Sequence, residues 1–162
     1  MNYGVYEKMH GGEFARQEGE SDQVYMDRVL SAVFDLPAAG ELQRFNEMLK
    51  PSYQGCCAEK MSLTVAYEPQ LWEANPAGNL HGGIIATAFD ITFGSLTRFC
   101  TGNSDALTVD LKISYMRGIP LDHPFLVTAY EDKTGQRVRF LHGELYDRVT
   151  GKLAATASTM FM

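Results

Sequence analysis

The stretch that decides the fold covers residues 82–99 and reads GGIIATAFDITFGSLTRF. Its length and composition predict one long helix that is apolar on nearly all sides. Asp90 is its only ionisable residue before Arg98. A helix of this kind is stable in water only when other structure covers it. The rest of the chain must therefore supply that cover.

Segments with the two-residue alternation of strands flank the helix on both sides. One precedes it and four follow, at residues 61–67, 107–115, 124–132, 136–147 and 152–161. Short turns at residues 133–135 and 149–151 make the last strands antiparallel. The order β–α–β–β–β–β predicts an α+β fold, in which a curved antiparallel sheet wraps around one central helix.

The first fifty residues read as an addition to this unit. Residues 1–22 form a polar, glycine-rich arm, and a helical pattern begins near Ser21 and ends at Leu36 and Pro37. A second short helix is expected over residues 39–49, before Pro51. We therefore expect an arm and helical extension over residues 1–50 and the main domain over residues 51–162.

Composition excludes several classes of protein. A chain of 162 residues fits one domain, and its net charge of −6 argues against general nucleic-acid binding. Three cysteines make no disulfide framework, and no Cys/His spacing suits a metal. The N-terminus has no signal core, and no apolar run is long enough for a membrane span. We expect a cytoplasmic protein with no cofactor, nucleic-acid or membrane partner.

Asp90 and the segment His81-Gly82-Gly83 are the candidate reactive features. A buried carboxylate is costly without a partner, and glycines at a helix start leave backbone N–H groups free for an oxyanion. Gly82 and Asp90 are eight residues apart, about 12 Å along a helix. One reacting centre cannot contact both in one chain. If both act, two antiparallel helices of a homodimer must share each site.

The motif Asn75-Pro-Ala-Gly-Asn-Leu-His81-Gly82-Gly83, with Asp90, Leu107–Asp110 and the ending at residues 145–155, resembles the PaaI-like acyl-CoA thioesterases of the hotdog fold. The resemblance covers residues 58–162. It implies hydrolysis of an acyl-CoA thioester in a homodimer, or in a tetramer of such dimers.

The resemblance also implies the roles of individual residues. Asp90 is the general base or nucleophile, Gly82 the oxyanion donor, and Asn75 and His81 lie near the thioester carbonyl. Thr108 orients the attacking water. Contacts to CoA are implied for Tyr115, Arg117, Lys133, Gly135, Gln136 and Arg137. The alternatives are a simple loop cap for His81, an ordinary strand threonine for Thr108 and solvated strand-edge charge for the basic residues.

Other functions remain open at this point. The chain can bind acyl-CoA as a regulatory protein without hydrolysing it, although such a binder gains nothing from Asp90. A hotdog hydratase or dehydratase is a third reading, with Glu73 in place of that group's aspartate. A cysteine nucleophile at Cys56 or Cys57 lacks a nearby histidine or helix start. A serine triad is disfavoured because the chain has no G-x-S-x-G turn.

Overall fold

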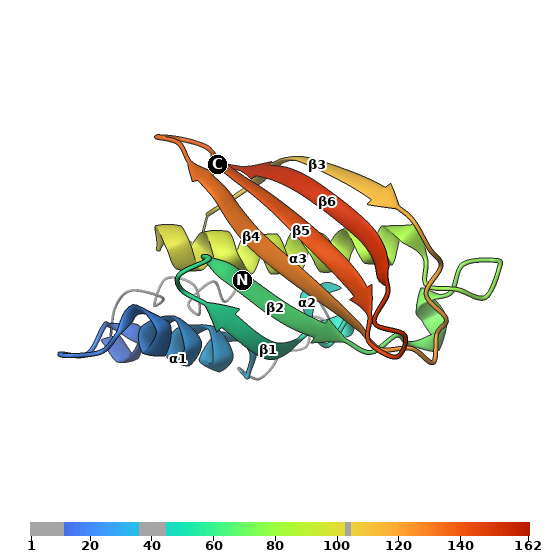
Figure 1. The fold of residues 1–162 in the computed structure, drawn as a ribbon, viewed down its shortest axis with the longest axis horizontal. Helices are drawn as coiled ribbons and strands as arrows, with labels where there is room; N and C mark the ends of the chain where they lie inside the picture. The colour runs from blue at the N-terminus through green and yellow to red at the C-terminus, as the bar shows by residue number, and fades with distance from the viewer. Residues whose placement is uncertain (1–11, 36–44, 103–104) are drawn as a thin grey trace.

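One curved, six-stranded sheet forms the body of the protein (Figure 1). The structure is a computed structural model and describes residues 12–35, 45–102 and 105–162. In spatial order the strands are β1 (Ser52–Cys57), β2 (Ser62–Tyr67), β4 (Phe125–Thr134), β5 (Arg139–Asp147), β6 (Leu153–Phe161) and β3 (Thr108–Tyr115). Every neighbouring pair is antiparallel.

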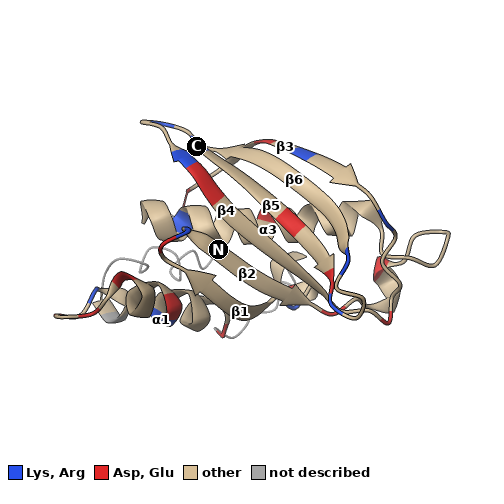
Figure 2. Ribbon diagram, in the orientation of Figure 1, with Lys and Arg blue, Asp and Glu red and all other residues tan. Residues whose placement is uncertain are grey.

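The long helix α3 (Gly82–Thr101) crosses behind this sheet in the view of Figure 1. Phe89, Phe93 and Leu96 are fully buried between helix and sheet. Figure 2 shows that charged residues lie mainly on α1, loops and strand ends, while α3 is almost free of them. The arrangement confirms the expected α+β class, because burial of this helix requires the sheet to curve around it.

The structure corrects the expected strand count. β1 was not expected, because its sequence SYQGCC lacks strong alternation and its burial pattern is irregular. Its register with β2 shifts between Tyr53 and Gly55, as in a β-bulge. Gly55 there has φ 151°, a backbone angle that favours glycine. A polar, bulged edge strand carries almost no periodic signal.

Helix α1 (Asp22–Phe34) begins at the expected cap, since the Ser21 side chain accepts from the Val24 N–H. Its buried residues Met26, Val29 and Leu30 join the same hydrophobic core as the sheet. α1 also packs along β1. The Gln23 side chain donates to the Cys56 carbonyl at 3.0 Å and accepts from the Ala58 N–H at 2.8 Å.

Only part of the remaining N-terminal prediction falls on described residues. The expected helix over residues 39–49 appears as the single turn α2 (Phe45–Met48), and residues 36–44 lie outside the described ranges. Of the expected arm, residues 1–11 lie outside them, and a short 3-10 turn covers Gly12–Phe14. No helix in the part of the chain that the structure describes could span a membrane.

Candidate active site

Asp90 lies on the one half-exposed stripe of α3, close to the edge strand β3. The Thr108 hydroxyl donates to its Oδ1 atom at 2.6 Å, a length typical of a hydrogen bond to a carboxylate. A register shift between Thr108 and Asp110 accompanies this contact, and such a bulge re-aims a side chain. The second oxygen, Oδ2, has no partner among the described residues. One oxygen of Asp90 is therefore held by a hydrogen bond, and the other has none to a described residue.

Backbone donors at the start of α3 are almost all used. The His81 Nδ1 accepts from the Gly83 N–H at 2.9 Å, and the His81 carbonyl accepts from Ile84 and Ile85. The Gly82 N–H makes no hydrogen bond to any described residue. It is thus the one unsatisfied donor in this first turn, at the positive end of the helix dipole.

A cleft of about 390 Å³ opens at this helix start. It is lined by Asn75, Leu80, Gly82, Ile85, Tyr115, Met116, Arg117 and Gly118. The Tyr115 hydroxyl donates to the Gly82 carbonyl at 2.9 Å and so holds the peptide that follows the free N–H. One guanidinium nitrogen of Arg117 donates to the Leu153 carbonyl, and its other N–H donors are available to a ligand.

Asn75 organises the loop that leads into α3. Its Oδ1 accepts from the backbone N–H groups of Ala77 at 2.9 Å and Asn79 at 3.1 Å. Its Nδ2 makes only a long contact of 3.4 Å to the Leu80 carbonyl, so one amide N–H remains for the cleft. His81 is exposed and is absent from the cleft lining. Because its Nδ1 accepts a bond, the proton of the neutral ring lies on Nε2.

Sequence reasoning gave Glu73 no role in positioning this loop. Its side chain is buried, and its Oε2 accepts from the Gln70 N–H at 3.1 Å, while Oε1 has no partner. Burial raises the pKa of this carboxyl. The Glu73 carbonyl accepts from the His81 N–H at 2.8 Å, which ties the 3-10 turn Leu71–Glu73 to the start of α3. The three-residue Gln70–Glu73 spacing of a capping box was the available signal.

The remaining predicted residues lie at the other end of the helix. Lys133 lies near the end of β4, and Gly135, Gln136 and Arg137 form the turn to β5. β5 begins at Arg139, whose guanidinium donates to the Cys100 carbonyl at 3.4 Å. An added Cβ at Gly135 would stand 2.7 Å from the Val138 carbonyl oxygen, so only glycine fits. Its N–H donates to that same oxygen and is not free for a phosphate.

The edge strand β3 exposes much of its apolar surface. Only Leu111 and Ile113 pack against the core. Val109 is 52% exposed, and Leu107, Tyr115 and Met116 are exposed as well. β3 has a strand neighbour, β6, on one side alone. In the described ranges, no cluster of His, Cys, Asp and Glu could hold a metal ion.

Comparison with known proteins identifies relatives of this architecture. The thioesterase superfamily matches residues 77–154. Mouse acyl-coenzyme A thioesterase 13 is 29% identical over 129 residues, which cover 78% of this chain and 86% of the mouse protein. A solved putative thioesterase from Ralstonia eutropha, related to phenylacetic acid degradation, is 26% identical with a TM-score of 0.64, and the match covers 71% of this chain and 86% of that one.

A further solved structure extends the match to more of the chain. Zebra fish thioesterase superfamily member 2 aligns with a TM-score of 0.67 at 22% identity, over 87% of this chain and 97% of that one. The matched family segment contains the glycine start of α3, Asp90 and Thr108. With one curved antiparallel sheet around one long helix, the chain has the hotdog fold, and over residues 77–154 it is similar to the thioesterase superfamily, as it is to the PaaI-like proteins of that fold.

Proposed function

We propose that this protein hydrolyses acyl-CoA thioesters at sites shared between two subunits. The observation that carries the proposal is the Asp90 carboxylate, with Oδ1 fixed by Thr108 at 2.6 Å and Oδ2 free. The second component is the free N–H of Gly82, which lines a cleft. A fixed base and a free oxyanion donor are the two groups that thioester hydrolysis needs.

A dimer explains how two groups on one helix, about 12 Å apart, can act together. A two-fold axis beside α3 makes the two helices antiparallel and brings the partner's Asp90 to Gly82. Two features support contact along this side. β3 has an open edge and an exposed apolar Val109, and Ala86, Thr87 and Asp90 are only half-buried in the middle of α3, where the other residues are buried. Analytical ultracentrifugation distinguishes this dimer from a tetramer of two dimers.

The same axis assembles the expected CoA contacts from two chains. Tyr115 and Arg117 line the cleft at the start of α3, whereas Lys133 and Arg137 lie near its end. Antiparallel helices place the partner's β4–β5 turn next to this cleft. Arg117 and that turn then offer positive charge from both sides to the phosphates of CoA.

In the proposed reaction, the thioester carbonyl oxygen accepts the Gly82 N–H and the Asn75 amide N–H. The partner's Asp90 takes a proton from water through Oδ2 while the water oxygen attacks the carbonyl carbon. The tetrahedral intermediate collapses with cleavage of the C–S bond. The CoA thiolate leaves and takes up the proton. Two groups thus share the developing charge, and Thr108 keeps the base aimed.

Asp90 can instead attack the carbonyl carbon itself, giving an anhydride that water then hydrolyses. A single turnover in oxygen-labelled water detects the second route. Label in the Asp90 carboxylate assigns it as the nucleophile, whereas label in the released acid alone is expected for Asp90 as the base and also for water attack on the acyl carbon of the anhydride. We further propose that the enzyme works in the cytoplasm, where the reducing environment keeps its free cysteines as thiols.

The test is CoA release by Asp90→Asn across short, medium, long and aromatic acyl-CoAs. The amide has the same shape but cannot act as a base, so turnover should fall at least ~10²-fold while acyl-CoA still binds. Asp122→Asn is the matched control, because Asp122 is exposed and does not line the cleft. Full turnover by a folded Asp90→Asn enzyme would refute the role. Binding without turnover by the wild type would instead favour a regulatory acyl-CoA binder.

Thr108→Val should lower kcat by about tenfold and change KM less. The substitution removes the hydrogen bond that fixes the Asp90 carboxylate but keeps the carboxylate itself. Thr108→Ser keeps the hydroxyl and should restore most of the rate. Equal rates for the Val and Ser variants would show that the 2.6 Å bond to Asp90 does not contribute to turnover.

A further inference from the structure

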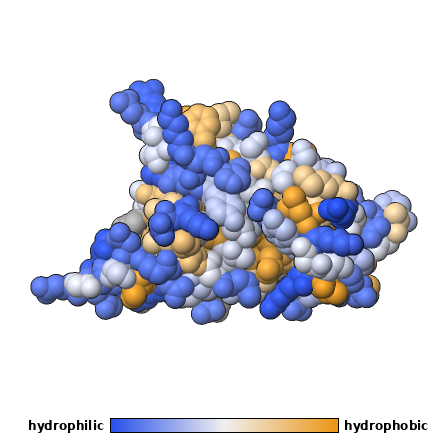
Figure 3. Space-filling view, in the orientation of Figure 1, coloured by the Kyte–Doolittle hydropathy of each residue, from blue (hydrophilic) through white to orange (hydrophobic). Residues whose placement is uncertain are grey.

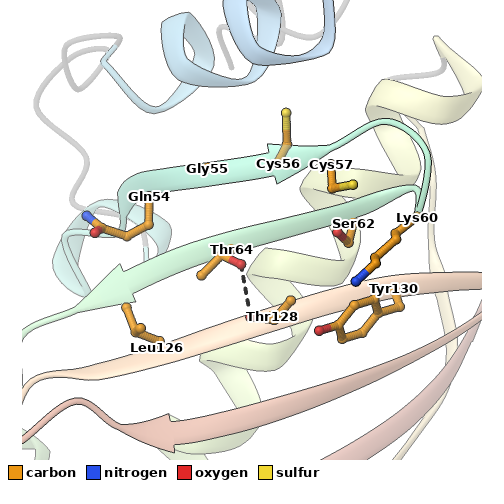
Figure 4. A pocket seen from close by; sticks show the side chains of 10 residues that line it. All are labelled: Gln54, Gly55, Cys56, Cys57, Lys60, Ser62, Thr64, Leu126, Thr128 and Tyr130. Atoms are coloured by element: carbon orange, nitrogen blue, oxygen red, sulfur yellow. Dashed lines mark hydrogen bonds between the residues drawn. The ribbon is translucent and has the colours of Figure 1, made fainter. Parts of the chain in front are cut away.

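A second pocket lies on the outer face of the sheet, away from α3 (Figure 4). Its volume is about 490 Å³, within the range of small-molecule sites. It is lined by Gln54, Gly55, Cys56, Cys57, Lys60, Ser62, Thr64, Leu126, Thr128 and Tyr130. We call it the outer pocket. Figure 3 shows that this face of the molecule is largely hydrophilic, with separate hydrophobic groups rather than one continuous patch.

The strand register explains why this surface is hollow. Cys57 pairs with Ser62, and Ser62 pairs with Tyr130, so these three side chains form one row across β1, β2 and β4. The next row is Gly55, Thr64 and Thr128. Gly55 has no side chain, and a Cβ placed there would meet nothing within 4 Å. The bulged glycine therefore leaves a gap beside the thiol row.

Two polar groups of the outer pocket are available for a ligand. The Ser62 residue is only 6% exposed and lines the pocket, yet its hydroxyl has no hydrogen-bond partner among the described residues. The Lys60 ammonium forms no ion pair with any described carboxylate. By contrast, the Thr64 and Thr128 hydroxyls already bond each other at 2.9 Å. The Ser62 hydroxyl is therefore able to donate to, or accept from, a ligand in the pocket.

The two adjacent cysteines of β1 face opposite ways, as successive strand residues do. The Cys56 thiol lies under α1, where its sulfur is 3.5 Å from the Gln23 Nε2, and Figure 4 shows it pointing toward that helix. Cys57 lies in the row with Ser62 on the pocket side. One thiol is thus held by α1 and the other borders an open cavity.

We propose that the outer pocket binds a small peptide-like disulfide with carboxylate groups, of the glutathione type, and that Cys57 exchanges with it. Lys60 attracts a carboxylate, and the Ser62 hydroxyl and Gln54 amide match peptide groups. The Cys57 thiolate attacks one sulfur of the disulfide, a new S–S bond to Cys57 forms, and the old S–S bond breaks. The displaced glutathione thiolate leaves and takes the proton that Cys57 lost.

The other two cysteines compete poorly for this reaction because the thiolate is the nucleophile. Burial raises the pKa of the Cys56 thiol, and burial raises the pKa of the Cys100 thiol to about 12. Cys56 also lines the outer pocket, but its sulfur points toward α1, and Cys100 is not part of the pocket lining. Exchange at Cys57 should therefore be selective.

The test treats the reduced full-length protein with glutathione disulfide and follows intact mass and non-reducing peptide maps. The expected result is one glutathionyl group per chain, on Cys57, and none on Cys57→Ser. Cys56→Ser is the matched control and should react like the wild type. Modification of Cys56 or Cys100 at a similar rate would overturn the proposal, as would no modification.

Lys60→Met tests recognition separately from simple access to the thiol. It should slow the reaction with glutathione disulfide about two- to fivefold, the range for one exposed charge interaction. The reaction with an uncharged disulfide, 2-hydroxyethyl disulfide, should keep its rate. Equal slowing of both, or of neither, would refute a role for the outer pocket in binding the anionic disulfide. Thermal melting confirms that each variant is folded.

Discussion

Two inactive variants should restore activity when they share a dimer. The pair is Asp90→Asn, which removes the base, and Gly82→Val, which blocks the oxyanion donor. A Cβ at Gly82 would stand 3.4 Å from the Tyr115 ring, so the two methyl groups of valine crowd the cleft beside the free N–H. Because eight helical residues separate the positions by about 12 Å, each site of the proposed dimer takes one residue from each subunit.

The size of the recovery follows from counting sites. In a mixed dimer, one site receives both substitutions, and the other combines wild-type Asp90 with wild-type Gly82. Random association makes about half of the dimers mixed, each with one good site, so about a quarter of wild-type activity should return. Co-expression with two different tags and tandem purification isolates the mixed dimer, which should then show about half of wild-type activity.

The Thr108 contact supplies a control with the opposite outcome. Thr108 and Asp90 touch within one chain at 2.6 Å. A mixed dimer of Asp90→Asn with Thr108→Val therefore has no site with both groups intact, and its activity should stay at or below that of Thr108→Val alone. The shared-site reasoning is refuted if the Asp90/Gly82 pair stays inactive as a purified heterodimer, or if both pairs recover equally.

Two further predictions concern stability. Gly143→Ala should lower the free energy of unfolding by about 1–3 kcal/mol in urea titrations, because the new Cβ would lie 2.8 Å from the Phe93 ring and 3.0 Å from the Thr128 carbonyl; an unchanged midpoint would contradict this. Burial alone would raise the pKa of Asp147, but hydrogen bonds from His123 and the following turn lower it to about 2. Its stabilising contribution is therefore fully present above about pH 4 and lost as the pH falls through 2, so Asp147→Asn should cost about 1 kcal/mol at neutral pH and only a small part of that at pH 2, measured by melting across that range.

Elements with strong periodicity could be predicted from the sequence. The helix expected over residues 82–99 is α3 (Gly82–Thr101), and the strand expected over residues 152–161 is β6 (Leu153–Phe161). Both bury long apolar patterns, so their local signal and their tertiary role agree. β1 could not be predicted, because its stability comes from pairing with β2 and packing under α1 rather than from its own pattern.

Some features of the candidate site could likewise be predicted from the sequence, and others could not. Residue types single out Asp90 and Gly82 as candidates, and their helix spacing predicts that, if both act, each site takes them from different subunits. The hydrogen bonds of the site depend on three-dimensional details without a local signal. A bulge accompanies the Thr108 bond to Asp90, the Tyr115 hydroxyl holds the Gly82 peptide, and the Glu73 backbone anchors the loop. No spacing along the chain encodes such contacts.

The hydrogen bonds between the Gln23 side chain and the end of β1 limit how copies of this protein can polymerise. Its side-chain amide bonds the Cys56 carbonyl and the Ala58 N–H, much as the backbone of a seventh strand would. A sheet with two open edges can add copies without end, which is the route to fibres. Here α1 of the same chain already covers the β1 edge, so β3 is the one edge of the sheet that another copy can pair with. Pairing through β3 joins two copies, and because α1 covers β1 in each copy, no third copy can add to the sheet.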